Sequence, residues 1–150
     1  MCEALETIFE KVEKCREGSC VISGRATIFK PDRGMNDPEM EREIFHRSDA
    51  QKCDCILCCE NGTVHVVEIL CGTLKYRDLK HKIGQLENCL KILKKIDRDI
   101  YERSKVYLAF DKYASSKKEP KLKEQAVNAR VMGKPLLLLH QTKTKRRELC

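Results

Sequence analysis

The sequence contains no tryptophan, and aromatic residues make up only 5% of its 150 residues. Proteins that bind single-stranded nucleic acid without sequence preference stack the bases on aromatic side chains, so this composition argues against such a platform. Long apolar runs are also missing, because the longest candidate, residues 136–139, is one short strand and cannot span a bilayer. The N-terminus is charged from Glu3 onward, which predicts no secretory signal and a cytoplasmic protein.

Asparagine and glutamine are scarce as well, with four of each against 35% charged residues. This balance is typical of thermophile or archaeal proteins. Such proteins are an exception to the rule that intracellular proteins rarely contain disulfides. The ten cysteines are therefore compatible with free thiols and with disulfides, and their spacing does not decide between the two. The run Cys-x-Cys-x-x-Cys-Cys from Cys53 to Cys59 does not match the separated Cys-x-x-Cys pairs of a zinc ribbon.

Charge is unevenly distributed along what we interpret as one domain, residues 1–150. The net charge is +7, and the basic residues concentrate at 75–98, at 117–123 and in a basic tail, 141–150. Acidic residues gather at the N-terminus and at 32–43. This asymmetry is typical of a protein that binds a polyanion along one side. In the alternative interpretation, the charged residues only form a solvated surface.

Hydrophobic periodicity predicts elements in the order α-β-β-β-α-β-α-β. That order indicates an α/β fold with a mixed central sheet flanked by helices on both faces. We interpret residues 31–50 as a lid that contains one short helix, and we expect the basic tail to fray. The expected elements are a helix at 2–16, a strand at 20–30, a hairpin at 53–71, a helix at 75–97, a strand at 105–110, a helix at 120–132 and a strand at 136–140.

The hairpin carries one carboxylate in each of its otherwise apolar strands, Asp54 and Glu68. A two-residue turn would place Asp54 opposite Ile69, so the two acids would point to opposite faces. A three-residue loop, 60–62, would place Asp54 directly across from Glu68. Gly62 suits the left-handed residue of such a bulged turn. A functional role for the acids therefore predicts the bulged turn.

Two carboxylates that face each other repel and are costly to desolvate. A divalent cation removes both problems, and carboxylate oxygens suit Mg²⁺ or Mn²⁺, which also bind substrate phosphates. In the alternative interpretation, one acid lies in solvent at a strand end and the other pairs with a nearby lysine.

The pattern Asp54-x13-Glu68, in a hairpin between an N-terminal helix and a long basic helix, resembles the PD-(D/E)XK nuclease superfamily. Residues 54–62 are similar to the second strand and turn of archaeal Holliday-junction resolvases, and residues 66–69 to their third strand. Residues 72–86 resemble the approach to the glutamine-containing helix of the RecB-like branch. The resemblance implies a restriction-endonuclease-like α-β-β-β-α-β core over residues 2–110, extended by a C-terminal helix and strand. It also implies Mg²⁺ or Mn²⁺ as cofactor and double-stranded or branched DNA as partner.

In that resemblance Asp54 and Glu68 bind the metal and an acid of the first helix assists, with Glu6 and Glu13 as the candidates. The lysine that the family places two residues after the second acid is Leu70 here. That lysine positions water and stabilises phosphate charge, and leucine can do neither. Three explanations remain open: the lysine has moved to Lys82 or Lys75, Arg25 reaches over from the first strand, or the fold is retained without cleavage.

The first functional hypothesis is a metal-dependent nuclease that hydrolyses phosphodiesters in DNA. The alternative is an inactive nuclease-fold protein that serves as a nucleic-acid-binding or assembly module, so enzymatic activity itself is left open. Gln85 would face the metal site or the DNA backbone, or it is an ordinary helix residue. The residues expected to contact nucleic acid are Arg77, Lys80, Lys82, Lys143, Lys145, Arg146 and Arg147.

Two further features have competing interpretations. His65 lies on the hairpin face opposite Glu68, with Cys55 and Cys59 as diagonal neighbours, which is compatible with a zinc site or with a packed histidine. The leucine stripe of the long helix could form a homodimer seam, although packing on the sheet explains it without a partner.

Overall fold

A central seven-stranded sheet organises the computed structural model, which describes residues 2–140 and 146–150. Its strand order is β1-β4-β5-β6-β7-β9-β8, and a second, three-stranded sheet has the order β10-β3-β2. The strands are β1 (Lys11–Val12), β2 (Cys15–Glu17), β3 (Cys20–Ser23), β4 (Ala26–Phe29), β5 (Cys55–Cys59), β6 (Val64–Leu74), β7 (Ser104–Tyr113), β8 (Arg130–Val131), β9 (Lys134–His140) and β10 (Arg146–Glu148). The helices are α1 (Glu3–Glu6), the 3-10 helix η1 (Pro31–Arg33), α2 (Pro38–Phe45), α3 (Tyr76–Ile96), α4 (Arg98–Arg103) and α5 (Leu122–Asn128).

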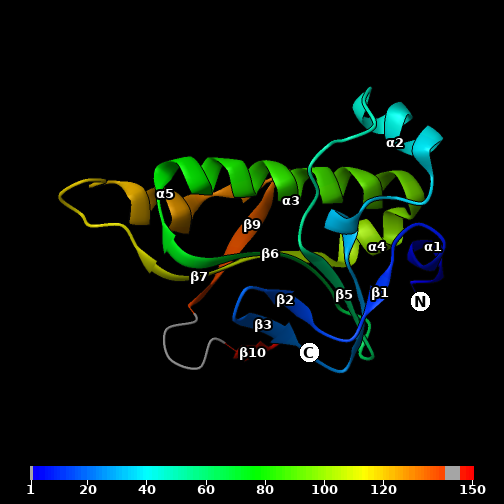
Figure 1. Ribbon diagram of the computed structural model, residues 1–150, viewed down its shortest axis with the longest axis horizontal. Coiled ribbons are helices and arrows are strands. Elements are labelled where there is room, and N and C mark those ends of the chain that lie inside the picture. The colour runs from blue at the N-terminus through cyan, green and yellow to red at the C-terminus, as the bar shows by residue number, and fades with distance from the viewer. Residues whose placement is uncertain (1, 141–145) are drawn as a thin grey trace.

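The molecule has three layers, with α3 along one face of the central sheet and the small sheet against the other (Figure 1). On the helical side, Leu86 and Leu90 of α3 pack with Val66 in one buried cluster. On the other side, Ile22 of β3 and Val67 of β6 belong to a second cluster. Strands β5 and β6 are buried on both faces for this reason, which explains their continuous apolar sequence.

The α/β class and the mixed sheet are confirmed: β4, β5 and β6 are antiparallel neighbours, whereas β6, β7 and β9 run parallel. The prediction of helices on both faces is wrong, because a small sheet covers the second face. The difference arises in the N-terminal segment. The predicted helix at 2–16 ends at Glu6, and β1 and β2 then pair with β4 and β3. Strand pairing and the bond between Cys15 and Cys55 outweigh the helical periodicity of this segment.

The predicted strand at 20–30 is two strands that belong to different sheets, and they part at Gly24. A Cβ atom at Gly24 would overlap the carbonyl oxygen of Leu149, so glycine lets the C-terminal segment approach closely. Leu149 N donates to Ser23 O at 2.8 Å, and β10 pairs in parallel with β3. The predicted fraying of the tail is therefore wrong for residues 146–150, and residues 141–145 lie outside the described part of the chain.

The hairpin has the predicted three-residue turn. Cys59 N donates to Thr63 O at 2.9 Å, and Gly62 adopts a φ of 94°. The strand register pairs Cys55 with Val67, which carries Asp54 to the position across from Glu68. The bulged turn is thus confirmed, and with it the meeting of the two acids.

Helix α3 and strands β7 and β9 lie where the sequence predicted a helix at 75–97 and strands at 105–110 and 136–140. The leucine stripe of α3 is buried against the sheet within the chain and so gives no support for a homodimer seam. The predicted helix at 120–132 is shorter, because α5 ends at Asn128 and β8 pairs with β9. The turn between β8 and β9 contains Met132 and Gly133, both at positive φ, as a tight two-residue hairpin turn requires.

All ten cysteines form disulfides, which answers the question that their spacing left open. These cross-links join segments 36 to 91 residues apart and restrict the unfolded chain. The disulfide pairs are Cys2–Cys58, Cys15–Cys55, Cys20–Cys71, Cys53–Cys89 and Cys59–Cys150.

Among the described residues no helix is both long enough and apolar enough to cross a membrane. The cytoplasmic location stays a prediction.

A buried ion pair anchors the segment interpreted as a lid. Asp37 caps α2 by accepting from Met40 N at 3.1 Å. Lys52 Nζ lies 2.6 Å from Glu41 Oε1, and both side chains are about 5% exposed. The short helix predicted within residues 31–50 is confirmed by α2, and the ion pair connects it to the chain just before β5.

Replacing Lys52 with methionine should lower the free energy of unfolding by about 3 kcal/mol, because Glu41 would be left as a buried, unpaired charge. The matched control is Lys95→Met, which breaks the exposed pair with Glu43 and should cost less than about 1 kcal/mol. Urea unfolding of the oxidised proteins measures both. Equal losses in the two variants would contradict the role of the buried pair.

Candidate metal centre

Asp54 and Glu68 meet at the start of β5, and Glu68 lies on the sheet face that α3 covers. Asp54 is 6% exposed, and its Oδ2 accepts a hydrogen bond from Ile69 N at 2.7 Å. Glu68 is completely buried, and its Oε1 has no hydrogen-bond partner within the described part of the chain. A buried carboxylate oxygen without a partner carries the full cost of its desolvation. Oε1 of Glu68 is therefore the atom of this site that a proton or a bound cation would stabilise.

Lys82 of α3 reaches down to the sheet at this point. Its Nζ lies 2.9 Å from Glu68 Oε2, and the lysine side chain is 18% exposed. Leu70 lies two residues after Glu68 and packs against the cluster on the helical side. The structure thus brings a lysine of α3 into contact with Glu68, which is compatible with the first of the three explanations for Leu70.

Burial controls the protonation of the two acids. It raises the pKa of Asp54 to about 9, and the neighbouring Glu68 charge adds to the rise while the Ile69 N–H opposes it. Burial also raises the pKa of Glu68 to about 7, against the lowering effect of Lys82. Burial works against the charge of Lys82, but Glu68 outweighs it, so the pKa of the lysine is raised. At neutral pH the pair of acids retains a proton beside a charged lysine.

A second group of charges, missed at the level of sequence, adjoins Asp54. Carboxylate oxygens of Glu17, Asp32 and Asp54 lie within 4.8 Å of one another. Lys30 donates to Glu17 at 2.8 Å and to Asp32 at 2.9 Å, and its side chain is 7% exposed. Burial opposes ionisation of Glu17, but the contact with Lys30 prevails and lowers its pKa. No spacing rule links these residues, because β2, the end of β4 and η1 meet only in the folded chain.

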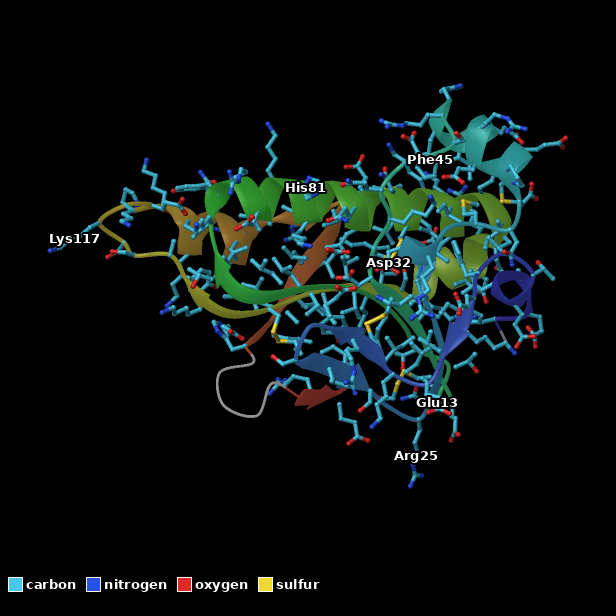
Figure 2. The ribbon with its side chains drawn as sticks, viewed as in Figure 1. Glu13, Arg25, Asp32, Phe45, His81 and Lys117 are labelled. Atoms are coloured by element: carbon cyan, nitrogen blue, oxygen red, sulfur yellow. A yellow bond between two sulfur atoms is a disulfide. The ribbon has the colours of Figure 1, made fainter. Side chains whose placement is uncertain are left out.

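The predicted assisting acids and two of the replacement cations lie elsewhere. Glu6 pairs with Lys11 at 3.0 Å and Glu13 is exposed, so the helical acid expected beside Asp54 is replaced by Glu17 of β2. Lys75 is exposed at the start of α3, and no described contact joins it to Glu68. Arg25 points away from the molecule at the turn between β3 and β4 (Figure 2).

Gln85 faces the chain that leads into β5 and lies beside a groove. Its Nε2 is 3.4 Å from Lys52 O, and its Oε1 is buried without a partner in the described structure. The groove has a volume of about 540 Å³ and includes Asp32, Lys52 and Gln85 in its lining. It opens between η1, α2 and α3, next to the acids that surround Lys30.

The predicted nucleic-acid contacts divide into three groups. Arg77 and Lys80 are exposed on the first turns of α3, whereas Lys82 turns inward to Glu68. Arg147 is exposed in β10 beside Arg146. Lys143 and Lys145 lie outside the described residues.

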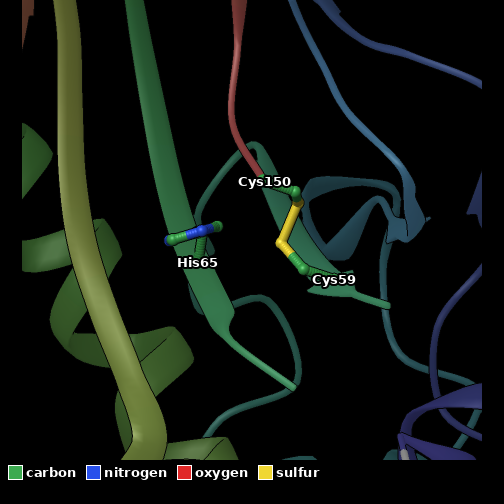
Figure 3. A group of neighbouring side chains, drawn as sticks. All are labelled: Cys59, His65 and Cys150. Carbon is green, nitrogen blue, oxygen red and sulfur yellow. A yellow bond between two sulfur atoms is a disulfide. The ribbon is translucent and has the colours of Figure 1, made fainter. Parts of the chain in front are cut away.

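The cysteines beside His65 differ from those that the sequence suggested as zinc ligands. Cys55 is bonded to Cys15, and the cysteines next to His65 are Cys59 and Cys150, which are bonded to each other (Figure 3). His65 is 5% exposed and packs edge-on against Tyr107, with ring centroids 5.0 Å apart. It is on the hairpin face opposite Glu68, as predicted.

Comparison with known proteins yields no relative: no protein-family model, no curated protein and no solved structure matches this chain.

Proposed function

We propose that this chain is a nuclease of the PD-(D/E)XK type that hydrolyses phosphodiesters in DNA with Mg²⁺ or Mn²⁺. The observation that carries the proposal is the arrangement of Asp54, Glu68 and Lys82, two facing acids and one lysine in contact. Two carboxylates can hold a divalent cation and an ammonium can stabilise charge on phosphate, and metal-assisted phosphodiester hydrolysis uses both contributions.

The residues present fit a hard divalent cation. Mg²⁺ and Mn²⁺ prefer oxygen ligands, and Glu68 Oε1 is a buried oxygen without a hydrogen-bond partner among the described residues. Asp54 faces it from the adjacent strand, and Glu17 and Asp32 add carboxylates on the other side of Asp54. When bound, the cation would polarise the phosphate and lower the pKa of a water ligand.

The protein's own residues perform the remaining tasks. Asp54 is oriented by the Ile69 N–H and Glu68 by Lys82, so both carboxylates are held before a ligand arrives. Lys82 carries the positive charge that stabilises the developing negative charge on phosphate. Arg77 and Lys80 lie on the first turns of the same helix and are exposed, where they can contact the DNA backbone.

The order of elements supports the proposal. An antiparallel meander, β4-β5-β6, is followed by the long helix α3 and by β7, which is parallel to β6. This order agrees with the β-β-β-α-β part of the core that the proposal expects, and α5 and β9 would then be the additions. The first helix that the proposal expects would correspond to α1, which has only four residues.

A second candidate is an inactive nuclease-fold protein that binds nucleic acid. The observation in its favour is that both acids are nearly inaccessible and that lysines already contact the cluster from two sides. In this alternative Lys82 and Lys30 replace the metal, and the exposed residues of α3 bind phosphates without cleavage.

Nicking of supercoiled plasmid with Mn²⁺ separates the two candidates. We expect the wild-type protein to nick DNA with Mn²⁺ and to stop on addition of EDTA. Lys82→Met should lower the rate by about 100-fold, because it removes the cation that stabilises the phosphate. The matched control, Lys80→Met, removes an exposed charge from the same helix and should change only the affinity for DNA and its salt dependence. Binding of DNA without any nicking would overturn the nuclease proposal in favour of the binding module.

A further inference from the structure

One disulfide differs from the other four in its surroundings. Cys59 is 1% exposed, but its partner Cys150 is exposed. In the remaining disulfides every cysteine is buried except Cys71, which is half-buried. Because exchange requires a thiolate to reach a sulfur atom, Cys59–Cys150 is the bond that an external dithiol reaches most easily.

A buried histidine lies beside this disulfide without a polar partner for one nitrogen. His65 Nδ1 has no hydrogen-bond partner in the part of the chain that the structure describes. The ligand atoms of Cys59, His65 and Cys150 all lie within 4.8 Å of one another (Figure 3). Burial and nearby Lys105 lower the pKa of His65, so the imidazole is held in the neutral form that binds metals.

We propose that Cys59, Cys150 and His65 form a redox-controlled zinc site. A dithiol reduces the Cys59–Cys150 bond and becomes a disulfide itself, leaving two thiols on the protein. Zn²⁺ then displaces the two thiol protons and takes His65 as its third protein ligand. Two cysteines and one histidine with a fourth, solvent ligand form an established tetrahedral zinc arrangement.

The local structure allows the small movement that this exchange needs. Two thiolates on one zinc ion are separated by roughly 3.8 Å, compared with about 2 Å in a disulfide. Cys150 follows β10 at the surface, whereas Cys59 is fixed by its backbone bonds to Thr63 and Gly62. The exposed cysteine can therefore move while the histidine and the buried cysteine keep their places. Zinc would hold the C-terminal strand to the sheet after the disulfide has opened.

The site is independent of the acidic cluster. His65 and Cys59 point to the face of the hairpin covered by the small sheet, and Glu68 points to the face covered by α3. The soft sulfur ligands select zinc over Mg²⁺ or Mn²⁺.

The test is Zn²⁺ binding after partial reduction with a phosphine, measured by competition with a chromogenic chelator. Thiol titration first establishes that two thiols have formed. We expect one Zn²⁺ per reduced chain and none in the oxidised protein, and Co²⁺ should give the charge-transfer absorption of a thiolate complex. The Cys150→Ser variant should bind Zn²⁺ more than about 100-fold more weakly than the wild type. Even mutation of a residue that only hydrogen-bonds to a metal ligand lowers metal affinity by roughly 10–100-fold.

Two further variants complete the test. His65→Ala removes the third ligand and should weaken binding to a similar degree. The double variant Cys20→Ser, Cys71→Ser removes a different disulfide and should bind Zn²⁺ as the wild type does. Cys150 is exposed, so its substitution keeps the proposal testable even where the buried His65 variant fails to fold. Absence of Zn²⁺ binding once the two thiols have formed, or binding that survives in Cys150→Ser, would overturn the site.

Discussion

Replacing Glu68 with glutamine should lower the Mn²⁺-dependent nicking rate by about 1,000-fold or more, because the variant loses a charged metal ligand and the partner of Lys82 together. Glutamine preserves the shape of the side chain, so the sheet and α3 can keep their packing. The loss would then report on charge at this position and not on a disrupted core.

The effect of Mn²⁺ on stability gives an independent measure of the same change. A ligand at about 100 times its Kd stabilises a protein by roughly 2.7 kcal/mol. For a chain of this size that corresponds to an increase in Tm of about 5–10 °C. We expect this increase in the wild type and none in Glu68→Gln.

Glu13→Gln is the matched control for Glu68→Gln. Glu13 is an exposed acid that the sequence also offered as a ligand, whereas the acids grouped with Asp54 in the described structure are Glu17 and Asp32. The control should retain both nicking and the Mn²⁺-dependent increase in Tm. A Glu68→Gln variant as active as Glu13→Gln would mean that the buried acid is not part of a catalytic site.

The stability of the metal-free protein should fall as the pH rises from about 4 to about 9. Burial raises the folded-state pKa of Asp54 to about 9 and of Glu68 to about 7. Between its unfolded and folded pKa values each acid binds more protons in the native state, so the free energy of unfolding decreases with pH. The loss of stability is complete only above the folded pKa of Asp54.

Asp54→Asn isolates the larger part of this effect. Asparagine keeps an acceptor for the Ile69 N–H but does not titrate, so the fall in stability with pH should be much smaller than in the wild type. Urea unfolding in EDTA at a series of pH values, with the disulfides intact, measures both slopes. The same slope in the two proteins would contradict the raised pKa of Asp54.

Several features of this site could be predicted from sequence because they depend on local rules. Strand alternation and the position of Gly62 predicted both the bulged turn and the meeting of Asp54 with Glu68, and the structure confirms them. These inferences need only the period of a strand. The sequence also offered Lys82 as one of two lysines that could replace the one missing at Leu70, and its Nζ lies 2.9 Å from Glu68 Oε2.

The remaining features depend on contacts between distant segments. Glu17 reaches Asp54 only because the segment 11–23 folds back onto the central sheet, where the Cys15–Cys55 and Cys20–Cys71 bonds hold it. Asp32 joins them from η1, which follows β4. The helical spacing of residues 2–16 predicted the wrong secondary structure for residues 11–16, since tertiary pairing outweighs a weak local preference. The bond between Cys59 and Cys150 likewise depends on the pairing of β10 with β3, and no sequence motif predicts it.

Isothermal titration of Mn²⁺ into the oxidised wild-type protein and into Glu68→Gln at about pH 8 tests the central claim most directly. The paired acids predict one binding event per chain in the wild type and none in the variant. Absence of binding to the wild type, or equal binding to both proteins, would contradict a metal centre at Asp54 and Glu68.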